Sequence, residues 1–146
     1  MQVFLGSDHR GFELKAKIIT WLNSHKISYV DFGPDHYDAE DDYNDVAKKV
    51  AQALLATEQP GTFGILICGS AQGMAMQANR FKGIRAAICN NQSEAYETRG
   101  HNDSNILCLS ADTIDDQYMG VIDTFLNTPP LPDEKYKRRN QKLDEE

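Results

Sequence analysis

Short apolar runs alternate with helix-forming segments along the whole chain, and this alternation constrains the fold more than any other feature. The runs are Val3–Leu5, Ile27–Phe32, Phe63–Ile67, Ile84–Cys89 and Ile106–Leu109. Strands that are separated by helices pair in parallel within one sheet. The pattern therefore predicts an α/β fold, a Rossmann-like three-layer sandwich with a five-stranded parallel sheet and a C-terminal helical tail.

The length and charge of the chain limit the classes of protein to which it can belong. Its 146 residues suit a single domain, residues 1–146, whose last part, residues 133–146, is a charged tail. The formal net charge of −7 disfavours nucleic acid and anionic membrane surfaces as partners. The three cysteines are an odd number, and we predict no secretory leader and no membrane span, so we expect a reduced, cytoplasmic protein.

The segment Phe63–Met74, FGILICGSAQGM, places a thiol at the turn between a buried strand and a helix. Cys68 ends the strand, and Gly69–Gly73 leads into the helix. Unpaired backbone N–H groups at the start of a helix create a positive potential, which favours an anion and predicts a pKa for Cys68 below about 8.5. The alternative is a small buried hydrophobe, the usual role of a free cysteine and the one expected for Cys89 and Cys108.

The sequence offers no pattern for a nucleotide or a metal. The turn after Cys68 has only Gly69 and Gly73, with no lysine at the start of the helix, so it matches neither the dinucleotide fingerprint nor the P-loop. The histidines, at positions 9, 25, 36 and 101, are scattered, and no H-x-x-x-H or C-x-x-C pair occurs. We therefore expect a protein that uses no cofactor and no metal.

The predicted topology also indicates where a ligand binds. In a doubly wound sheet, ligands lie beyond the carboxyl ends of the strands. This rule predicts that the loops Ser7–Arg10, Cys68–Gly73 and Arg99–Asn105 share one edge. A purely structural interpretation of Asp8 is an N-cap for the first helix. The acidic run Glu40–Asp42 is expected to face solvent.

Several motifs follow one another in a fixed order up to about residue 128: SDHRGFELK, the DY pair Asp42–Tyr43, GILICGSAQGM, NRFKGIRAAIC and RGHNDSNIL. Together they closely resemble the B-type ribose-5-phosphate isomerases, in the superfamily that includes galactose-6-phosphate isomerase subunits. The resemblance implies an aldose–ketose isomerase of carbohydrate metabolism and the pentose phosphate pathway, which interconverts ribose 5-phosphate and ribulose 5-phosphate through a cis-enediolate. It also implies a homodimer or tetramer whose active sites draw on two subunits.

The resemblance further implies a role for individual residues. Cys68 is the base that moves a proton between C1 and C2, Ser70 stands beside it, and His101 helps to open the furanose ring. The remaining residues contact the sugar hydroxyls, the phosphate or the enediolate, the last through backbone N–H groups. They are Asp8, His9, Tyr43, Gly69, Ala71, Gln72, Gly73, Asn102, Lys135 and Arg139.

Three positions depart from the family pattern. Ala71 replaces a common glycine, Asp112 stands where an arginine that reaches the substrate is often found, and Lys135 replaces an arginine of the tail. Lysine lacks the bidentate fork that suits phosphate. Two alternatives stay open, the first because specificity depends on pocket size and the second because of Asp112 and Lys135. One is an isomerase of a six-carbon sugar phosphate, such as allose 6-phosphate or galactose 6-phosphate, and the other is a catalytically weak sugar-phosphate-binding subunit.

Overall fold

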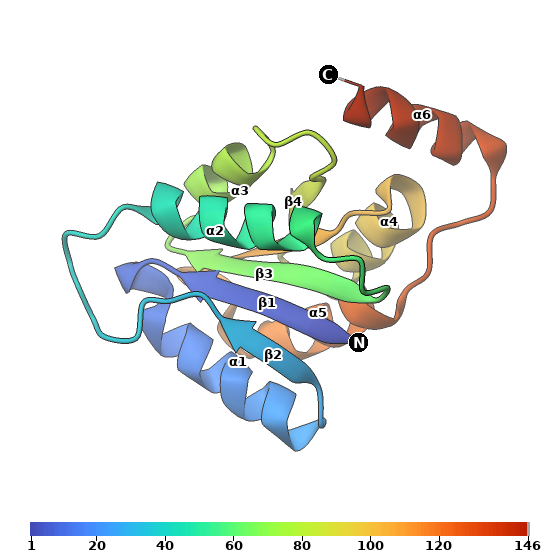
Figure 1. Cartoon of the computed structure of the whole chain (residues 1–146). Helices are drawn as coiled ribbons and strands as arrows, with labels where there is room; N and C mark the ends of the chain where they lie inside the picture. Colours follow the sequence, from blue (N-terminus) through green and yellow to red (C-terminus); the bar gives the residue numbers. More distant parts are fainter. Residues whose placement is uncertain (146) are drawn as a thin grey trace.

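The strands form one parallel sheet in the computed structural model, which describes residues 1–145. They are β1 (Gln2–Ser7), β2 (Ser28–Asp31), β3 (Thr62–Cys68), β4 (Ala86–Ile88) and β5 (Ile106–Ser110). Their order across the sheet is β2-β1-β3-β5-β4, and every neighbouring pair is parallel (Figure 1). This arrangement confirms the predicted five-stranded parallel sheet and places the strand that ends at Cys68 in its centre.

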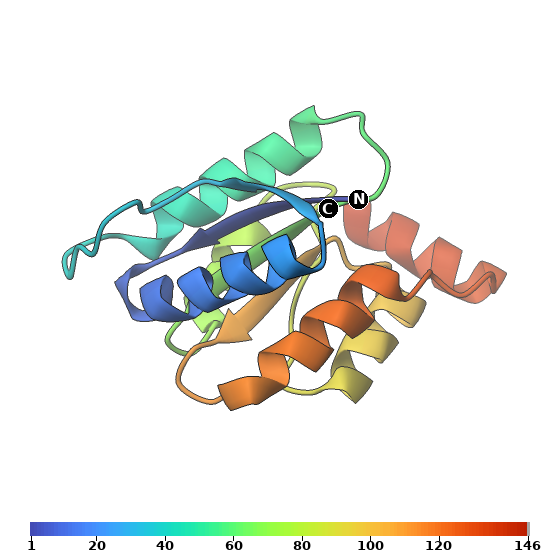
Figure 2. The ribbon, with the colours of Figure 1, turned by 90° about the horizontal axis from the view of Figure 1, so that it is seen from below.

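Helices cover both faces of this sheet. They are α1 (Phe12–Ser24), α2 (Tyr43–Ala56), α3 (Gln72–Ala78), α4 (Gln92–Asn102), α5 (Tyr118–Asn127) and α6 (Glu134–Asp144), with the 3-10 turns η1 (His9–Gly11) and η2 (Asp115–Gln117). Helices α1, α4 and α5 lie on one side of the sheet and α2 lies on the other (Figure 2). Helix α3 packs against α2, and α6 packs against α4. The result is the predicted three-layer α/β sandwich with a helical tail.

The two faces of β3 bury alternate side chains in two separate hydrophobic clusters. Ile65 and Ile67 pack in the cluster with α1, α4 and α5, whereas Leu66 and Cys68 pack in the cluster with α2 and α3. Ile65, Leu66 and Ile67 have no exposed surface. An unbroken apolar run suits a strand that is covered on both sides, so the sequence pattern and the burial agree.

The segment before β5 lies at the opposite edge of the sheet from the one predicted. Residues Arg99–Asn102 form the last turn of α4 and not a loop. The carbonyl of Asn105, just before β5, accepts a hydrogen bond of 2.9 Å from the N–H of Gly64, near the amino end of β3. A helix between two parallel strands leaves the carboxyl edge of the sheet and returns to the amino edge. The prediction that Arg99–Asn105 joins the edge that carries Cys68 is therefore wrong.

The charged tail folds as α6 and is attached to the body of the protein. The guanidinium of Arg85 donates hydrogen bonds of 2.8 and 2.6 Å to the two carboxylate oxygens of Asp144. The N–H of Leu131, in the connection before α6, donates to the carbonyl of Gly100 at 2.9 Å. No helix within residues 1–145 has the length and apolar character that crossing a membrane requires.

Candidate active site

The loop that follows β1 is fixed tightly against the end of the central strand. The N–H of Asp8 donates to the carbonyl of Ile67 at 3.1 Å, and the Asp8 carboxylate accepts from the N–H of Gly11 at 3.0 Å. A Cβ atom at Gly11 would lie 2.6 Å from the carbonyl oxygen of Ile67, so only glycine allows this close approach. Asp8 thus caps η1, and burial raises its pKa while the Gly11 N–H opposes that change.

His9 is held by an acidic residue that no sequence pattern selected. Asp41 Oδ1 lies 2.7 Å from His9 Nδ1 and accepts a further hydrogen bond of 3.2 Å from the His9 N–H. The hydrogen bond with Asp41 raises the pKa of His9. Because the Asp41 side chain is only 16% exposed, the prediction that Glu40–Asp42 faces solvent is wrong for this residue. With Nδ1 engaged by Asp41, Nε2 is the ring nitrogen left for a ligand.

Cys68 lies at the carboxyl end of β3 and is only 5% exposed. Burial raises its pKa above the ordinary value of a thiol, and the backbone N–H groups of Met74, Ala71 and Ser70 act in the opposite direction. The nearby charge of Asp8 also raises the pKa. The prediction of a lowered pKa is therefore wrong for the isolated chain, because desolvation of the thiolate outweighs the stabilisation by the turn.

The turn after Cys68 has the backbone conformation that the sequence suggests for a glycine-rich segment. Ala71 is in the left-handed region, with φ 66° and ψ −10°, and precedes the first residue of α3. Glycine adopts this conformation without steric strain, so alanine keeps the shape of the turn at a modest energetic penalty. Ser70 Oγ accepts a hydrogen bond of 3.3 Å from the N–H of Gln72.

Tyr43 covers the start of α3 from the first turn of α2. A Cβ atom at Gly73 would lie 2.6 Å from Tyr43 Cζ, so the tyrosine ring packs directly on the glycine. The structure therefore brings together, at the carboxyl edge of the sheet, one group of the residues predicted for the site. This group, the cysteine half-site, comprises Asp8, His9, Tyr43, Cys68, Gly69, Ser70, Ala71, Gln72 and Gly73.

The other predicted residues lie at the amino edge. The rings of His101, on α4, and Tyr136, on α6, are stacked with their centroids 4.8 Å apart. Asn140 Nδ2 donates to the carbonyl of His101 at 3.1 Å. This second group, the histidine half-site, comprises His101, Asn102, Lys135 and Arg139, and α4 spans the distance between the two edges.

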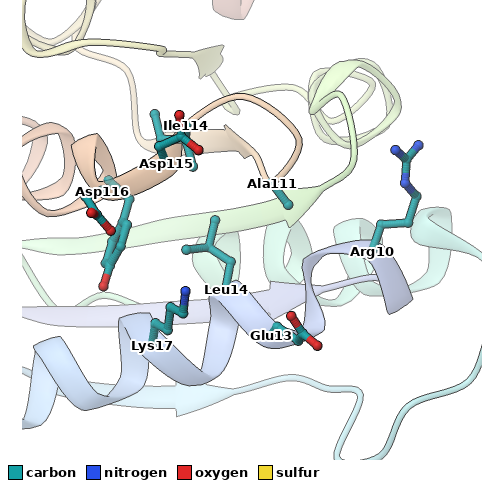
Figure 3. Close-up of a pocket in the computed structure, with 9 residues that line it drawn as sticks. Arg10, Glu13, Leu14, Lys17, Ala111, Ile114, Asp115 and Asp116 are labelled. Atoms are coloured by element: carbon teal, nitrogen blue, oxygen red, sulfur yellow. The ribbon is translucent and has the colours of Figure 1, made fainter.

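Arg10 also belongs to the cysteine half-site, although no motif singled it out. Its guanidinium forms an ion pair with Asp112, which follows β5. Figure 3 shows Arg10 beyond the end of β3, pointing away from most of the other side chains that line a cavity of about 520 Å³ between α1 and the start of α5. The negative charge of Asp112 is therefore paired with Arg10 of the same chain. The sequence analysis, which noted only that Asp112 replaces an arginine, did not predict this pair.

The other two cysteines lie in the core, as predicted. Cys89 and Cys108 have no exposed surface. Burial raises the pKa of Cys89 to about 12 and raises that of Cys108 still more.

Within residues 1–145, no group of three or more His, Cys, Asp or Glu side chains is arranged to hold a metal ion.

A buried thiol near backbone N–H groups and a histidine–aspartate pair share the carboxyl edge of a parallel sheet, the edge at which α/β proteins bind small ligands. The chain belongs to the Ribose/Galactose Isomerase family, whose model matches residues 3–143. It is thus an aldose–ketose isomerase by class. The match to the family model reaches residue 143, whereas the sequence motifs end at about residue 128.

Individual relatives agree with this family. The chain is 40% identical over 125 residues to a probable ribose-5-phosphate isomerase B of Mycoplasma pneumoniae, covering 85% of this chain and 81% of the relative. A crystal structure of a ribose 5-phosphate isomerase from Thermotoga maritima superposes with a TM-score of 0.93 at 40% identity, covering 99% and 98% of the two chains. The Mycoplasma genitalium ribose-5-phosphate isomerase B with bound ribulose-5-phosphate superposes with a TM-score of 0.90 at 35% identity, covering 99% and 94%.

Proposed function

We propose that this protein interconverts ribose 5-phosphate and ribulose 5-phosphate through a cis-enediolate. The observation that carries the proposal is the position of Cys68, with the N–H groups of Ser70, Ala71 and Met74 near its sulfur. The names of the relatives and the ribulose-5-phosphate bound in the Mycoplasma genitalium structure support the choice of substrate. No metal or nicotinamide has a part in this route.

In the proposed reaction, the Cys68 thiolate removes the proton from C2 of the opened aldose. The electron pair of the C–H bond forms the C1–C2 double bond, and the C1 carbonyl oxygen becomes negative. Backbone N–H groups of Gly69–Gly73 stabilise this oxygen as they do an anion at a helix start. The proton then returns from sulfur to C1, while the proton of the C2 hydroxyl passes to the negative C1 oxygen, so that C1 carries a hydroxyl and C2 becomes the ketone.

The ring must open before this step, and the proposed group for it is His101 of a partner subunit. The cysteine and histidine half-sites lie at opposite edges of one sheet, so a single chain does not bring them together. We therefore propose a homodimer, or a tetramer built from such dimers, in which each subunit completes the other's site. His101 stacks on Tyr136 of α6, and Lys135 Nζ lies 4.8 Å from the centroid of the same tyrosine ring. Lys135 and Arg139, both on α6, are the cations proposed for the phosphate group.

Subunit mixing tests this arrangement. Cys68→Ala and His101→Ala homodimers should each be inactive, and mixed dimers should regain up to about one quarter of the activity in a statistical mixture, since only the site with both residues intact works. The matched control is a mixture of Cys68→Ala with Cys68→Ala,His101→Ala subunits, which should stay inactive. A fully active monomer in sedimentation experiments at assay concentration would contradict the shared site.

The substrate is tested by a coupled assay of the purified protein against ribose 5-phosphate, allose 6-phosphate and galactose 6-phosphate. We expect the highest kcat/KM with ribose 5-phosphate. A higher value with either six-carbon substrate would replace the proposed substrate, and lack of turnover with all three would favour a catalytically weak binding subunit. The charge of Asp112, which had favoured that last alternative, is balanced by Arg10 in the structure.

A further inference from the structure

An ion pair crosses the end of the central strand, directly above the turn that follows Cys68. In the sheet, β3 lies between β1 and β5. Arg10 follows β1 and Asp112 follows β5, so their pair joins the two flanking loops. The Asp112 N–H donates a hydrogen bond of 3.1 Å to the carbonyl of Gly69, and the Ser110 hydroxyl donates one of 2.7 Å to the same oxygen. Asp112 is thus fixed to the turn that it spans.

The guanidinium of Arg10 packs on the backbone of that turn. A Cβ atom at Gly69 would lie 2.5 Å from Arg10 Nη1 and 2.6 Å from Nε, so glycine is required for the contact. The backbone that carries Arg10 is fixed as well, because Asp8 and Gly11 anchor η1 to Ile67. Arg10 therefore lies in a turn that is attached to the central strand, and Asp112 holds its side chain, as is typical of a preorganised binding group.

Arg10 retains hydrogen-bond donors that an anion can use. Its Nη2 donates to Asp112, while Nε and Nη1 donate to no group within residues 1–145. The side chain as a whole is 53% exposed, so a ligand can reach the guanidinium. Lys15, by contrast, is 4% exposed, and its Nζ donates to Asp31 at 3.0 Å and to the carbonyl of Pro34. An anionic ligand at this edge thus meets the guanidinium of Arg10, not the ammonium of Lys15.

The acidic surroundings favour a cation at this edge. Asp8, Asp41 and Asp112 all lie at this edge, in a chain with a formal net charge of −7. A guanidinium among these carboxylates offsets their repulsion of a phosphate group. Resting on the proposed function, we propose that Arg10 binds the phosphate of the sugar substrate from the same subunit as Cys68, and that Asp112 is the positioning residue that holds Arg10 over Gly69.

Substitution of Arg10 tests this proposal. Steady-state kinetics with ribose 5-phosphate and competitive inhibition by inorganic phosphate are measured for Arg10→Ala and Arg10→Lys. We expect Arg10→Ala to raise both KM and the phosphate inhibition constant by about tenfold with kcat within about twofold, because a charged hydrogen bond to a bound group is lost. Arg10→Lys should recover about a third of the loss, since it restores charge without the fork.

The matched control is Lys17→Ala, which removes an exposed cation that lines the same cavity on α1. It should leave KM and the phosphate inhibition constant unchanged. An effect of Lys17→Ala equal to that of Arg10→Ala would mean that only the net charge of this face matters, and would overturn the assignment. An Arg10→Ala variant that keeps its circular dichroism spectrum and wild-type phosphate inhibition would overturn it as well.

The role of Asp112 is tested by combining substitutions. Asp112→Ala should raise the phosphate inhibition constant by about threefold in the wild-type background and have no such effect in Arg10→Ala, because it acts through Arg10. If Asp112→Ala instead lowered the constant in both backgrounds, Asp112 would be a simple repulsive charge and not a positioning residue.

Calorimetric titration with inorganic phosphate separates this proposal from the proposed function. If the unmodified protein does not turn over ribose 5-phosphate, the proposed function fails, while loss of phosphate affinity in Arg10→Ala still supports the binding site. If turnover occurs and phosphate affinity is the same in both proteins, only the role of Arg10 is overturned.

Discussion

Replacing Cys68 with serine tests the proposed base directly. Serine keeps the size of the side chain at a position that is only 5% exposed, but its hydroxyl is far too weakly acidic to provide the base. A positioned general base contributes about 10²–10⁴-fold to the rate, which corresponds to about 2.7–5.4 kcal/mol of transition-state stabilisation. We expect kcat to fall by this factor while KM changes little.

The pH dependence of kcat/KM of the wild-type enzyme is a second test of Cys68 as the proposed base. Burial raises the pKa of Cys68, so the thiolate is a minor species at neutral pH. Because the proposed base acts in its deprotonated form, kcat/KM should rise with pH by about tenfold per unit below that pKa and level off only above it. Ribulose 5-phosphate formation from about pH 6 to about pH 9 measures the profile.

Cys89→Ser and Cys108→Ser are the controls for this experiment. Each places a hydroxyl in a fully buried apolar position, so each should lower the free energy of unfolding by about 1–3 kcal/mol and leave kcat of the folded enzyme unchanged. Iodoacetamide should label Cys68 before either of them, and substrate should protect it. Near-wild-type kcat in Cys68→Ser, or a profile that levels off well below the ordinary thiol pKa of about 8.5, would refute the reasoning.

Three further predictions follow from the same edge of the sheet. Asp41→Asn should lower the pKa of His9 toward its ordinary value, since the hydrogen bond that raises it is weakened; NMR titration of the ring measures this, and an unchanged pKa would contradict it. Gly11→Ala should destabilise the protein by about 1–3 kcal/mol in urea denaturation, because its Cβ would meet the Ile67 carbonyl at 2.6 Å. Exhaustive chelation should leave turnover unchanged, whereas a loss that one added metal restores would show that a metal is needed.

The sheet could be predicted because its signals are local. The unbroken apolar run of β3 is bounded by a glycine-containing turn on each side, and its residues Ile65–Ile67 are fully buried as the run predicts. The end of α4 was predicted less well. Gly100, His101 and Asn102 have low intrinsic preference for a helix, yet Leu131 N–H and Asn140 Nδ2 bond the carbonyls of Gly100 and His101 and stabilise that last turn.

The proximity of candidate site residues was predicted where one motif holds several of them together, as in the segment from Cys68 to Gly73. It was not predicted where two distant segments meet. Asp41 is 32 positions from His9, and Asp112 is 102 positions from Arg10. An acidic residue in a loop carries no local sign of its partner, so only the folded chain reveals these pairs. The family resemblance supplied the members of both half-sites and implied a site shared by two subunits, whereas the strand-end rule wrongly placed Arg99–Asn105 at the edge that carries Cys68.

The burial of Cys68 also bears on how the enzyme withstands oxidants. Peroxide attacks the thiolate of a cysteine and not the protonated thiol, so a raised pKa slows the first oxidation step to a sulfenic acid at neutral pH. A disulfide between Cys68 and either of the other cysteines is disfavoured as well, since Cys89 and Cys108 are fully buried and their pKa values are higher than that of an ordinary thiol. The same desolvation that makes the thiolate of the proposed base a minor species should therefore slow oxidation of its sulfur.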